Sequence, residues 1–350
     1  MVRARRAWRH SREWTALAAA IAIAAGVGGC GGGPTKVTRV ALVTPGSAND
    51  PEWTIRARNS FEALVDRLRI RGETAESPPA GKVEPSLEQL SGDTQLVFAH
   101  EPGYASAAAT AAERTKVPEL VWGDPAAQKP GRVADVEIDG GQAGYVAGFM
   151  SARASISERL AITIVSEGTP WDQRVWNTMA GGFIAGARAY NSKTRIWVVR
   201  ATPQEATSAT KRQIIKHNIQ TIFVLARPTS VPLYNLIKTQ ILGERFYVGI
   251  IGDKERINQE NIILASIVYH FEGLFSQAIE DVRRGTFGRH GYTLSFANRG
   301  LVIAATGRTP SDTMEAAIGR ERELVAGKIT VPVTPTPSSV EELLRGTLRQ

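Results

Sequence analysis

Cysteine is almost absent from the sequence, and the common motifs of metal and nucleotide enzymes are absent altogether. The chain of 350 residues holds one cysteine, Cys30, so an internal disulfide framework is excluded. It contains no CxxC, HExxH or GxxxxGK[ST] motif, and its five histidines show no metal-ligand spacing. No G-x-S-x-G motif is present either. We therefore expect no bound metal, no cofactor and no enzymatic activity.

Long apolar runs are also missing, apart from one at the N-terminus. Five arginines and one glutamate in residues 1–13 precede the uncharged run "WTALAAAIAIAAGVGG". This run is too short for a membrane span, which needs about 20 apolar residues. A basic segment, a short apolar segment and small residues before a cleavage point are typical of a secretory signal peptide, here residues 1–29.

The residues Val27, Gly28 and Gly29 before Cys30 resemble a bacterial lipobox. We therefore predict that Cys30 is acylated and that residues 30–36 form a flexible glycine-rich tether. The mature protein would then be lipid-anchored at the extracytoplasmic face of the cell membrane. A plain signal peptide followed by an incidental cysteine is the alternative.

A strong excess of positive charge is missing from the mature chain. The net charge of +8 falls to +4 without residues 1–29, with 37 basic and 33 acidic residues left. These basic residues are scattered, which argues against nucleic acid as a partner. We expect a monomer.

Short apolar runs alternate with helical segments along the rest of the chain. Buried β-branched runs separated by helices are typical of parallel sheets with helices on both faces. Two such series predict an α/β protein with two doubly wound, Rossmann-like lobes around a hinged cleft. The predicted strands are 37–43, 94–100, 118–124, 133–139, 159–166, 195–200, 221–226 and 245–253.

The expected boundaries follow from this series. An N-terminal lobe spans 37–155 and is completed by about 254–285, and a C-terminal lobe spans 156–253 and is completed by about 286–330. Residues 331–350 form a tail rich in proline and threonine, followed by a short helix.

Ligands in this architecture bind beyond the carboxyl ends of the strands, so we examined those positions. The candidate ligand-binding residues there are polar or aromatic: Asn49, Asp50, Trp53, His100, Tyr104, Trp171, Trp176, Asp253 and Tyr269. Each has a structural alternative. Asp50 before Pro51 fits a helix N-cap, Asp253 fits a turn, and the tryptophans fit packing beneath a loop.

Aromatic faces and isolated carboxylates without a cationic clamp favour a neutral, planar, hydroxylated ligand over an anion. A Ser/His/Asp triad could be assembled from Ser166, His100 and Asp124, but a serine-rich sequence offers many such sets. The sequence therefore indicates recognition of a small molecule and not its chemical conversion.

Several segments resemble the basic membrane protein family, the purine-nucleoside-receptor-like lipoproteins of ABC importers. They cover nearly all of the mature chain in the family's order: "ALVTPGSANDPEW", "DGGQAGYVAGFMSA", "GGFIAGARAYN", "GDKERINQENIILASIV", "VRRGTFGRHGYTLSFANRGLVIA" and "ELVAGKITVPVTP". The resemblance implies a type I periplasmic-binding-protein fold that captures nucleosides or related purines for an ABC permease.

The resemblance also implies roles for three residues. Asp50 and Asp253 would hold the sugar, and Trp53 would stack on the base. Thr54 stands where many members have asparagine, and Tyr269 where many have lysine. A free purine base is therefore an open alternative to a nucleoside. A sensory or structural lipoprotein of the same fold, presenting ligand or surface to a membrane receptor or the cell wall, is the alternative to import.

Overall fold

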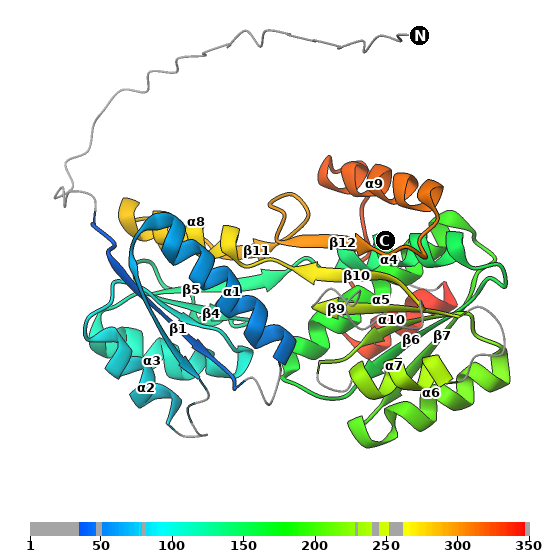
Figure 1. Cartoon of the computed structure of the whole chain (residues 1–350), viewed down its shortest axis with the longest axis horizontal. Coiled ribbons are helices and arrows are strands. Elements are labelled where there is room, and N and C mark those ends of the chain that lie inside the picture. The colour runs from blue at the N-terminus through cyan, green and yellow to red at the C-terminus, as the bar shows by residue number, and fades with distance from the viewer. Residues whose placement is uncertain are drawn as a thin grey trace, which may run out of the picture. The chain divides into compact units, whose positions relative to one another are not determined.

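Two parallel-dominated sheets organise the computed structural model (Figure 1), which describes residues 35–46, 51–76, 78, 82–227, 230–239, 245–251 and 262–346. The first sheet has the order β11-β5-β4-β3-β1-β2, and its strands pair in parallel. Its strands are β1 (Arg39–Thr44), β2 (Arg71–Glu76), β3 (Val97–Ala99), β4 (Glu119–Trp122), β5 (Val133–Ile138) and β11 (Tyr292–Leu294).

The second sheet has the order β12-β10-β9-β8-β6-β7. Only β12, at its edge, runs antiparallel to its neighbour among the described pairings. Its strands are β6 (Arg159–Val165), β7 (Arg195–Ala201), β8 (Thr221–Leu225), β9 (Phe246–Ile251), β10 (Ile263–Tyr269) and β12 (Leu301–Ala305).

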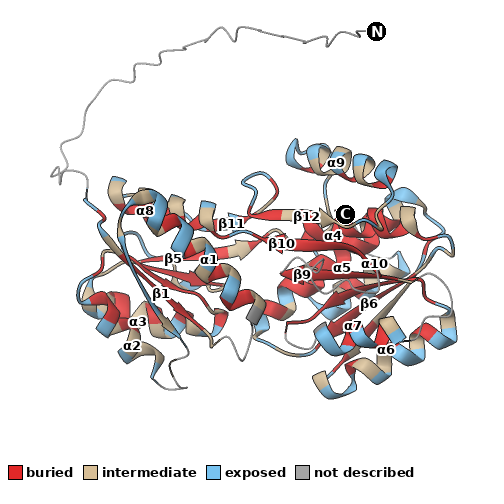
Figure 2. Ribbon diagram, in the orientation of Figure 1, coloured by how far each residue is buried: buried red, intermediate tan, exposed pale blue. Residues whose placement is uncertain are grey.

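Helices cover both faces of each sheet, which explains the continuous apolar runs of the strands. On β1, Val40 and Leu42 point into one core cluster, and Ala41 and Val43 point into another. The first lobe contains α1 (Pro51–Leu68), α2 (Val83–Ser91), the short η1 (Pro102–Tyr104), α3 (Ala105–Thr115), η2 (Pro125–Ala127) and α8 (Glu272–Arg284). The second contains α4 (Gly140–Ala154), α5 (Pro170–Tyr190), α6 (Pro203–His217), α7 (Ser230–Thr239), α9 (Ser311–Val325) and α10 (Pro337–Arg345). Figure 2 shows most strands buried within these layers, whereas the edge strand β2 is largely exposed.

The chain crosses between the lobes after β5, after β10 and between β11 and β12, and these places differ from the expected bounds. Helix α4 was expected in the first lobe but packs in the second, against α5. Strand β10 was expected to complete the first lobe but pairs with β9, and β11 pairs with β5 instead of joining the second lobe. The same buried β-branched pattern suits either sheet, so the pattern does not specify the partner.

Glycines bring α4 and α5 into close contact. A Cβ at Gly144 would lie 2.0 Å from the Met179 carbonyl oxygen, and one at Gly148 would lie 2.0 Å from that of Phe183. From the other helix, a Cβ at Gly182 would lie 2.1 Å from the Gly141 carbonyl oxygen. The two backbones therefore meet directly, and no larger residue fits at these positions.

The C-terminal tail packs along α5. Thr334 is fully buried, and its hydroxyl donates a 2.9 Å hydrogen bond to the Asn177 carbonyl. Further along, the Arg188 guanidinium donates to the carbonyl oxygens of Leu343 (2.7 Å) and Leu344 (2.6 Å) at the end of α10. The predicted amphipathic helix is therefore present, and it is fastened to the second lobe.

The N-terminal leader, Cys30 and the tether before residue 35 lie outside the described residues. Within the described ranges, no helix combines the length and the apolar character needed to cross a bilayer.

Replacing Gly182 with alanine tests the contact between α4 and α5. We expect G182A to lower the free energy of unfolding by about 1–3 kcal/mol, because the new methyl group overpacks the interface and forces the helices apart. Denaturant titration would measure this change. The control is G319A on α9, where a Cβ meets no atom within 4 Å. Alanine is the better helix former there, so stability should stay level or rise by up to about 1 kcal/mol. Equal stability of both variants would contradict the tight contact.

Candidate functional site

Four of the predicted site residues come together where the strand ends of the two lobes meet: Trp53, His100, Trp171 and Tyr269. Trp53 lies in the first turns of α1, His100 directly follows β3, Trp171 begins α5, and Tyr269 ends β10. Three others, Asn49, Asp50 and Asp253, lie outside the described residues.

Trp53 is the centre of this group. Its indole stacks on the His100 imidazole with 4.4 Å between ring centroids and 21° between planes. The indole N–H donates to the His100 carbonyl oxygen at 3.1 Å, which fixes the ring orientation. Trp122, at the end of β4, meets Trp53 edge-on at 5.0 Å, and Phe271 meets it edge-on at 5.2 Å.

Trp171 and Tyr269 complete the group, at 6.4 Å and 6.2 Å from the Trp53 ring. Trp171 belongs to the second lobe, but its indole N–H donates to the Glu137 carboxylate of the first at 2.9 Å. Its ring lies over Gly123, which has φ +72° and where a Cβ would be 2.1 Å from the ring. We define the aromatic cluster as Trp53, His100, Trp122, Trp171, Tyr269 and Phe271.

Two predicted residues lie outside the aromatic cluster. Trp176, on the buried face of α5, lies in the core, and no described ring contact joins it to the cluster. Tyr104 is half-buried in η1 and packs against the alanine-rich core of the first lobe. Burial, with the nearby Glu101 carboxylate, raises the pKa of Tyr104 to about 12. A ligand contact by either residue stays a prediction.

A buried ion-pair group lies against the aromatic cluster. Arg227, which follows β8 of the second lobe, donates from Nη1 to Glu101 Oε1 of the first lobe at 2.9 Å. Its Nε lies 3.3 Å from Asp172 Oδ1, and its guanidinium carbon lies 4.8 Å from the centre of the Trp53 ring. Our expectation of a cleft without a cation was therefore wrong. The two carboxylates more than match the charge of Arg227, so the site still disfavours an anion.

The start of α5 and the end of β6 fix this ion pair. Thr169 caps α5, and its backbone N–H and hydroxyl both donate to Asp172 Oδ2, at 2.7 and 2.9 Å. Asp172 therefore presents its other oxygen, Oδ1, to Arg227. Glu167 accepts a 2.7 Å hydrogen bond from the backbone N–H of Arg227. These bonds set the direction from which Arg227 enters the site.

His100 is fully buried and uncharged in the folded protein. Burial lowers its pKa well below the usual value of 6.5, and the positive charge of Arg227 lowers it further. Neither ring nitrogen has a hydrogen-bond partner among the described residues. Its imidazole therefore brings polar atoms into an otherwise aromatic group.

Comparison with known proteins identifies the family. The sequence profile of the PnrA-like ABC transporter substrate-binding proteins (Bmp) matches residues 37–320. The chain belongs to this family. These proteins are extracytoplasmic solute-binding proteins and not enzymes, so the predicted family and the absence of enzymatic activity are confirmed.

Solved structures agree on the fold. An ABC transporter solute-binding protein from Conexibacter woesei is 18% identical with a TM-score of 0.69, covering 85% of this chain and 99% of that one. One from Aeropyrum pernix is 16% identical with a TM-score of 0.69, covering 89% and 98%. A periplasmic solute-binding protein from Actinobacillus succinogenes with bound D-allose is 13% identical with a TM-score of 0.60, covering 77% and 98%. No match is found among proteins with curated functions. The predicted periplasmic-binding-protein fold is confirmed.

Sequence reasoning missed four residues at this junction of the lobes: Glu101, Trp122, Arg227 and Phe271. The signal was available, because Glu101, Trp122 and Arg227 stand at or within two residues of the ends of β3, β4 and β8. The candidate ligand-binding residues included none from 118–124 or directly after 221–226, and they included His100 and Tyr104 but not the neighbouring Glu101. Phe271 follows Tyr269 by two positions, at the crossing from β10 to α8.

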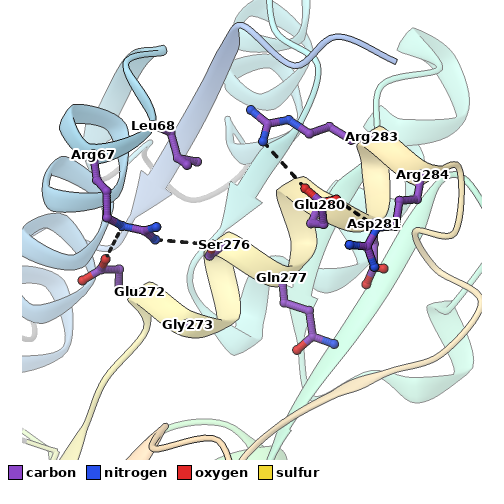
Figure 3. Close-up of a pocket in the computed structure, with 10 residues that line it drawn as sticks. All are labelled: Arg67, Leu68, Glu272, Gly273, Ser276, Gln277, Glu280, Asp281, Arg283 and Arg284. Atoms are coloured by element: carbon purple, nitrogen blue, oxygen red, sulfur yellow. Dashed lines mark hydrogen bonds and ion pairs between the residues drawn. The ribbon is translucent and has the colours of Figure 1, made fainter. Parts of the chain in front are cut away.

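A surface hollow lies between α1 and α8 (Figure 3), and none of the residues of the aromatic cluster lines it. It has a volume of about 500 Å³, and its lining includes Arg67, Glu272, Ser276, Glu280 and Arg284. Arg67 pairs with Glu272 at 2.9 Å, and Arg284 pairs with Glu280 at 2.9 Å. Because its charges satisfy one another at the surface, we assign it no ligand.

The pH dependence of stability tests the environment of His100. The folded state holds the imidazole neutral, whereas the unfolded chain binds a proton below about pH 6.5. Wild type should therefore lose stability relative to His100→Gln as the pH falls below about 6.5, by up to about 1.4 kcal/mol per pH unit.

The difference in the free energy of unfolding between wild type and His100→Gln, taken at each pH, isolates the contribution of His100. Burial raises the pKa of Asp135 to about 7 and that of Glu119 well above its usual range, so both favour the folded state at lower pH. Their effect is common to both proteins and cancels. Parallel stability curves from denaturant titrations between about pH 5 and pH 7.5 would contradict a buried neutral His100.

Proposed function

We propose that this Bmp-family protein captures a nucleoside or related purine and delivers it to an ABC permease. The observation that carries the proposal is the aromatic cluster at the junction of the lobes, bordered by carboxylates. Planar heterocycles stack on aromatic faces, and carboxylates accept hydrogen bonds from ring N–H, amino and hydroxyl groups. Sugars alone would not need so many aromatic rings.

The sugar contacts are part of this proposal. Asp50, with Asn49 beside it, precedes α1, the helix that carries Trp53, and Asp253 follows β9. Both acids therefore stand in the sequence next to elements that reach the cleft. In this assignment Asp50 and Asp253 accept hydrogen bonds from ribose hydroxyls while the base lies against Trp53.

Closure of the lobes would signal that ligand is bound. Contacts between the lobes already include Arg227 with Glu101, Trp171 with Glu137, and the Arg174 guanidinium with the Gly123 carbonyl at 3.2 Å. A ligand that touches both lobes adds to these contacts and shifts the population toward the closed form. The permease would recognise that form and accept the ligand.

Anchoring through Cys30 is also proposed. Cys30 stands five positions before Thr35, the first described residue, so the tether between them reaches at most about 18 Å. The Thr35 N–H donates to the Arg283 carbonyl at 3.1 Å, at the C-terminal end of α8. A lipid on Cys30 would therefore hold this end of the first lobe near the membrane.

A ligand screen on the mature domain, combined with Asp50→Ala, tests the proposed ligand. A nucleoside or purine should raise the melting temperature by several degrees at about 1,000 times its dissociation constant. Asp50→Ala should weaken nucleoside binding by about 1.5–3 kcal/mol in calorimetry, the cost of one charged hydrogen bond. The control is Glu62→Ala, an exposed acid on α1, which should bind like wild type.

The panel also includes bases, sugars and amino acids, since D-allose was found in one protein of this fold. Binding of a sugar or amino acid without any purine would refute the nucleoside assignment. Unchanged nucleoside affinity of Asp50→Ala would remove that residue from the site. If a well-folded sample binds nothing in the panel, import loses its support and a sensory or structural lipoprotein becomes the better proposal.

Cys30→Ser tests the anchor. The wild-type chain, expressed with its leader in a bacterial host that processes lipoproteins, should incorporate labelled palmitate and sediment with membranes. The variant should incorporate no label and should be lost from the membrane fraction, because the acylated thiol is gone. Equal labelling of the two proteins would overturn the assignment of Cys30.

A further inference from the structure

The group around Arg227 has the form of a ligand site that is already filled. The guanidinium carbon lies 4.8 Å from the centre of the Trp53 ring, Nη1 donates to Glu101 Oε1 at 2.9 Å, and Nε forms an ion pair with Asp172 Oδ1 at 3.3 Å. The side chain of Arg227 is 8% exposed, and those of Glu101 and Asp172 are 16% and 2% exposed. Stacking on an aromatic face with in-plane hydrogen bonds to acceptors is how proteins hold planar heterocycles and guanidino groups.

We propose that the Arg227 guanidinium occupies a donor-recognising subsite of the cleft, and that the ligand's own N–H edge replaces it between Trp53, Glu101 and Asp172. This inference rests on the proposed function, because it concerns the same cleft. The ligand class is a planar compound with several N–H donors on one edge. A 2-amino-6-oxopurine and a free guanidino compound both have this chemistry.

The position of the subsite fits such an exchange. Trp53 and Glu101 belong to the first lobe, whereas Asp172 and Arg227 belong to the second. The subsite is therefore complete only when the lobes meet. In an open form Arg227 leaves with the second lobe and exposes the face of Trp53. A ligand that enters at that stage meets Trp53 and Glu101 first, and Asp172 on closure.

The charges select the ligand class. Without the guanidinium, the subsite presents two poorly exposed carboxylates, whose burial is costly unless hydrogen-bond donors face them. An anionic ligand would be repelled by the same pair. Adenine offers a ring acceptor where guanine offers a ring N–H, so the carboxylates favour a guanine-type edge. Asp172 Oδ2 is held by Thr169, which leaves Oδ1 directed toward the subsite.

Chemical rescue of Arg227→Ala tests the subsite without any nucleoside. We expect this variant to melt below wild type, and N-ethylguanidine at millimolar concentration to raise its melting temperature by several degrees. Ethylammonium, which lacks the planar fork, should have a smaller effect, and wild type should respond more weakly than the variant, because its own Arg227 guanidinium competes for the subsite. The matched control is Arg153→Ala, which removes a guanidinium 2.8 Å from Asp312 and 5.8 Å from the Tyr190 ring, far along α4. Equal rescue of the two variants would overturn the proposal.

Calorimetry with guanosine and adenosine tests the exchange itself. Arg227→Ala should bind guanosine at least tenfold more tightly than wild type does, and tenfold more tightly than it binds adenosine. Adding Glu101→Gln should reduce the guanosine affinity at least tenfold. Arg227→Lys, which retains the charge if the alanine variant does not fold, should bind guanosine several-fold more tightly than wild type, because an ammonium fills the subsite poorly.

The outcomes separate this inference from the proposed function. If guanosine and adenosine bind equally to wild type and both Arg227 variants, purine capture stands and the subsite assignment fails. Loss of guanosine binding on removal of Arg227 would make Arg227 a direct ligand contact and would also overturn the inference. If neither nucleoside binds but N-ethylguanidine rescues Arg227→Ala selectively, purine capture fails and the subsite stands, with free guanidino compounds as its ligands.

Discussion

The direction of the strands is the constraint on which the cleft depends. Because the strands of both sheets run parallel except for the edge strand β12, β3, β4 and β8 all end at the junction of the lobes. Residues at or just beyond these ends, including His100, Trp122 and Arg227, are brought together although they are far apart in the sequence. An antiparallel arrangement would send half of them to the opposite edge.

Burying a guanidinium against the Trp53 ring requires compensation, and the capping box of α5 is part of it. Thr169 satisfies one oxygen of Asp172 and leaves the other for Arg227, so a local feature of a helix end supports a contact between lobes. Glu101 supplies a second acceptor from the other side. Apolar burial and charge pairing therefore act at the same place, and the packed core continues from one lobe into the other.

Much of the fold could be predicted from the sequence, because each buried strand is a compact β-branched run bordered by turn residues. Trp53, His100, Trp171 and Tyr269 were found by the rule that ligands bind beyond strand ends. Arg227 was not, since charge balance suggested a solvated basic residue, and its acidic partners lie 126 and 55 positions away in the sequence. The crossings between lobes escaped prediction for a similar reason: strand pairing is nonlocal, and both sheets have the same residue pattern.

Helix α5 links the back of the second lobe to the cleft. Its first turn carries Trp171 and Asp172, its middle lies against the glycines of α4, and its last turn is held by α10 through Arg188. A helix of 21 residues is about 30 Å long and stiff over that length. It therefore connects the junction of the lobes rigidly to α10, whose Leu343 and Leu344 carbonyl oxygens bind Arg188. The orientation of Trp171 and Asp172 is thereby linked through α5 to α10 at the other end of the helix, so a fusion or truncation that displaces α10 would also act on these two side chains.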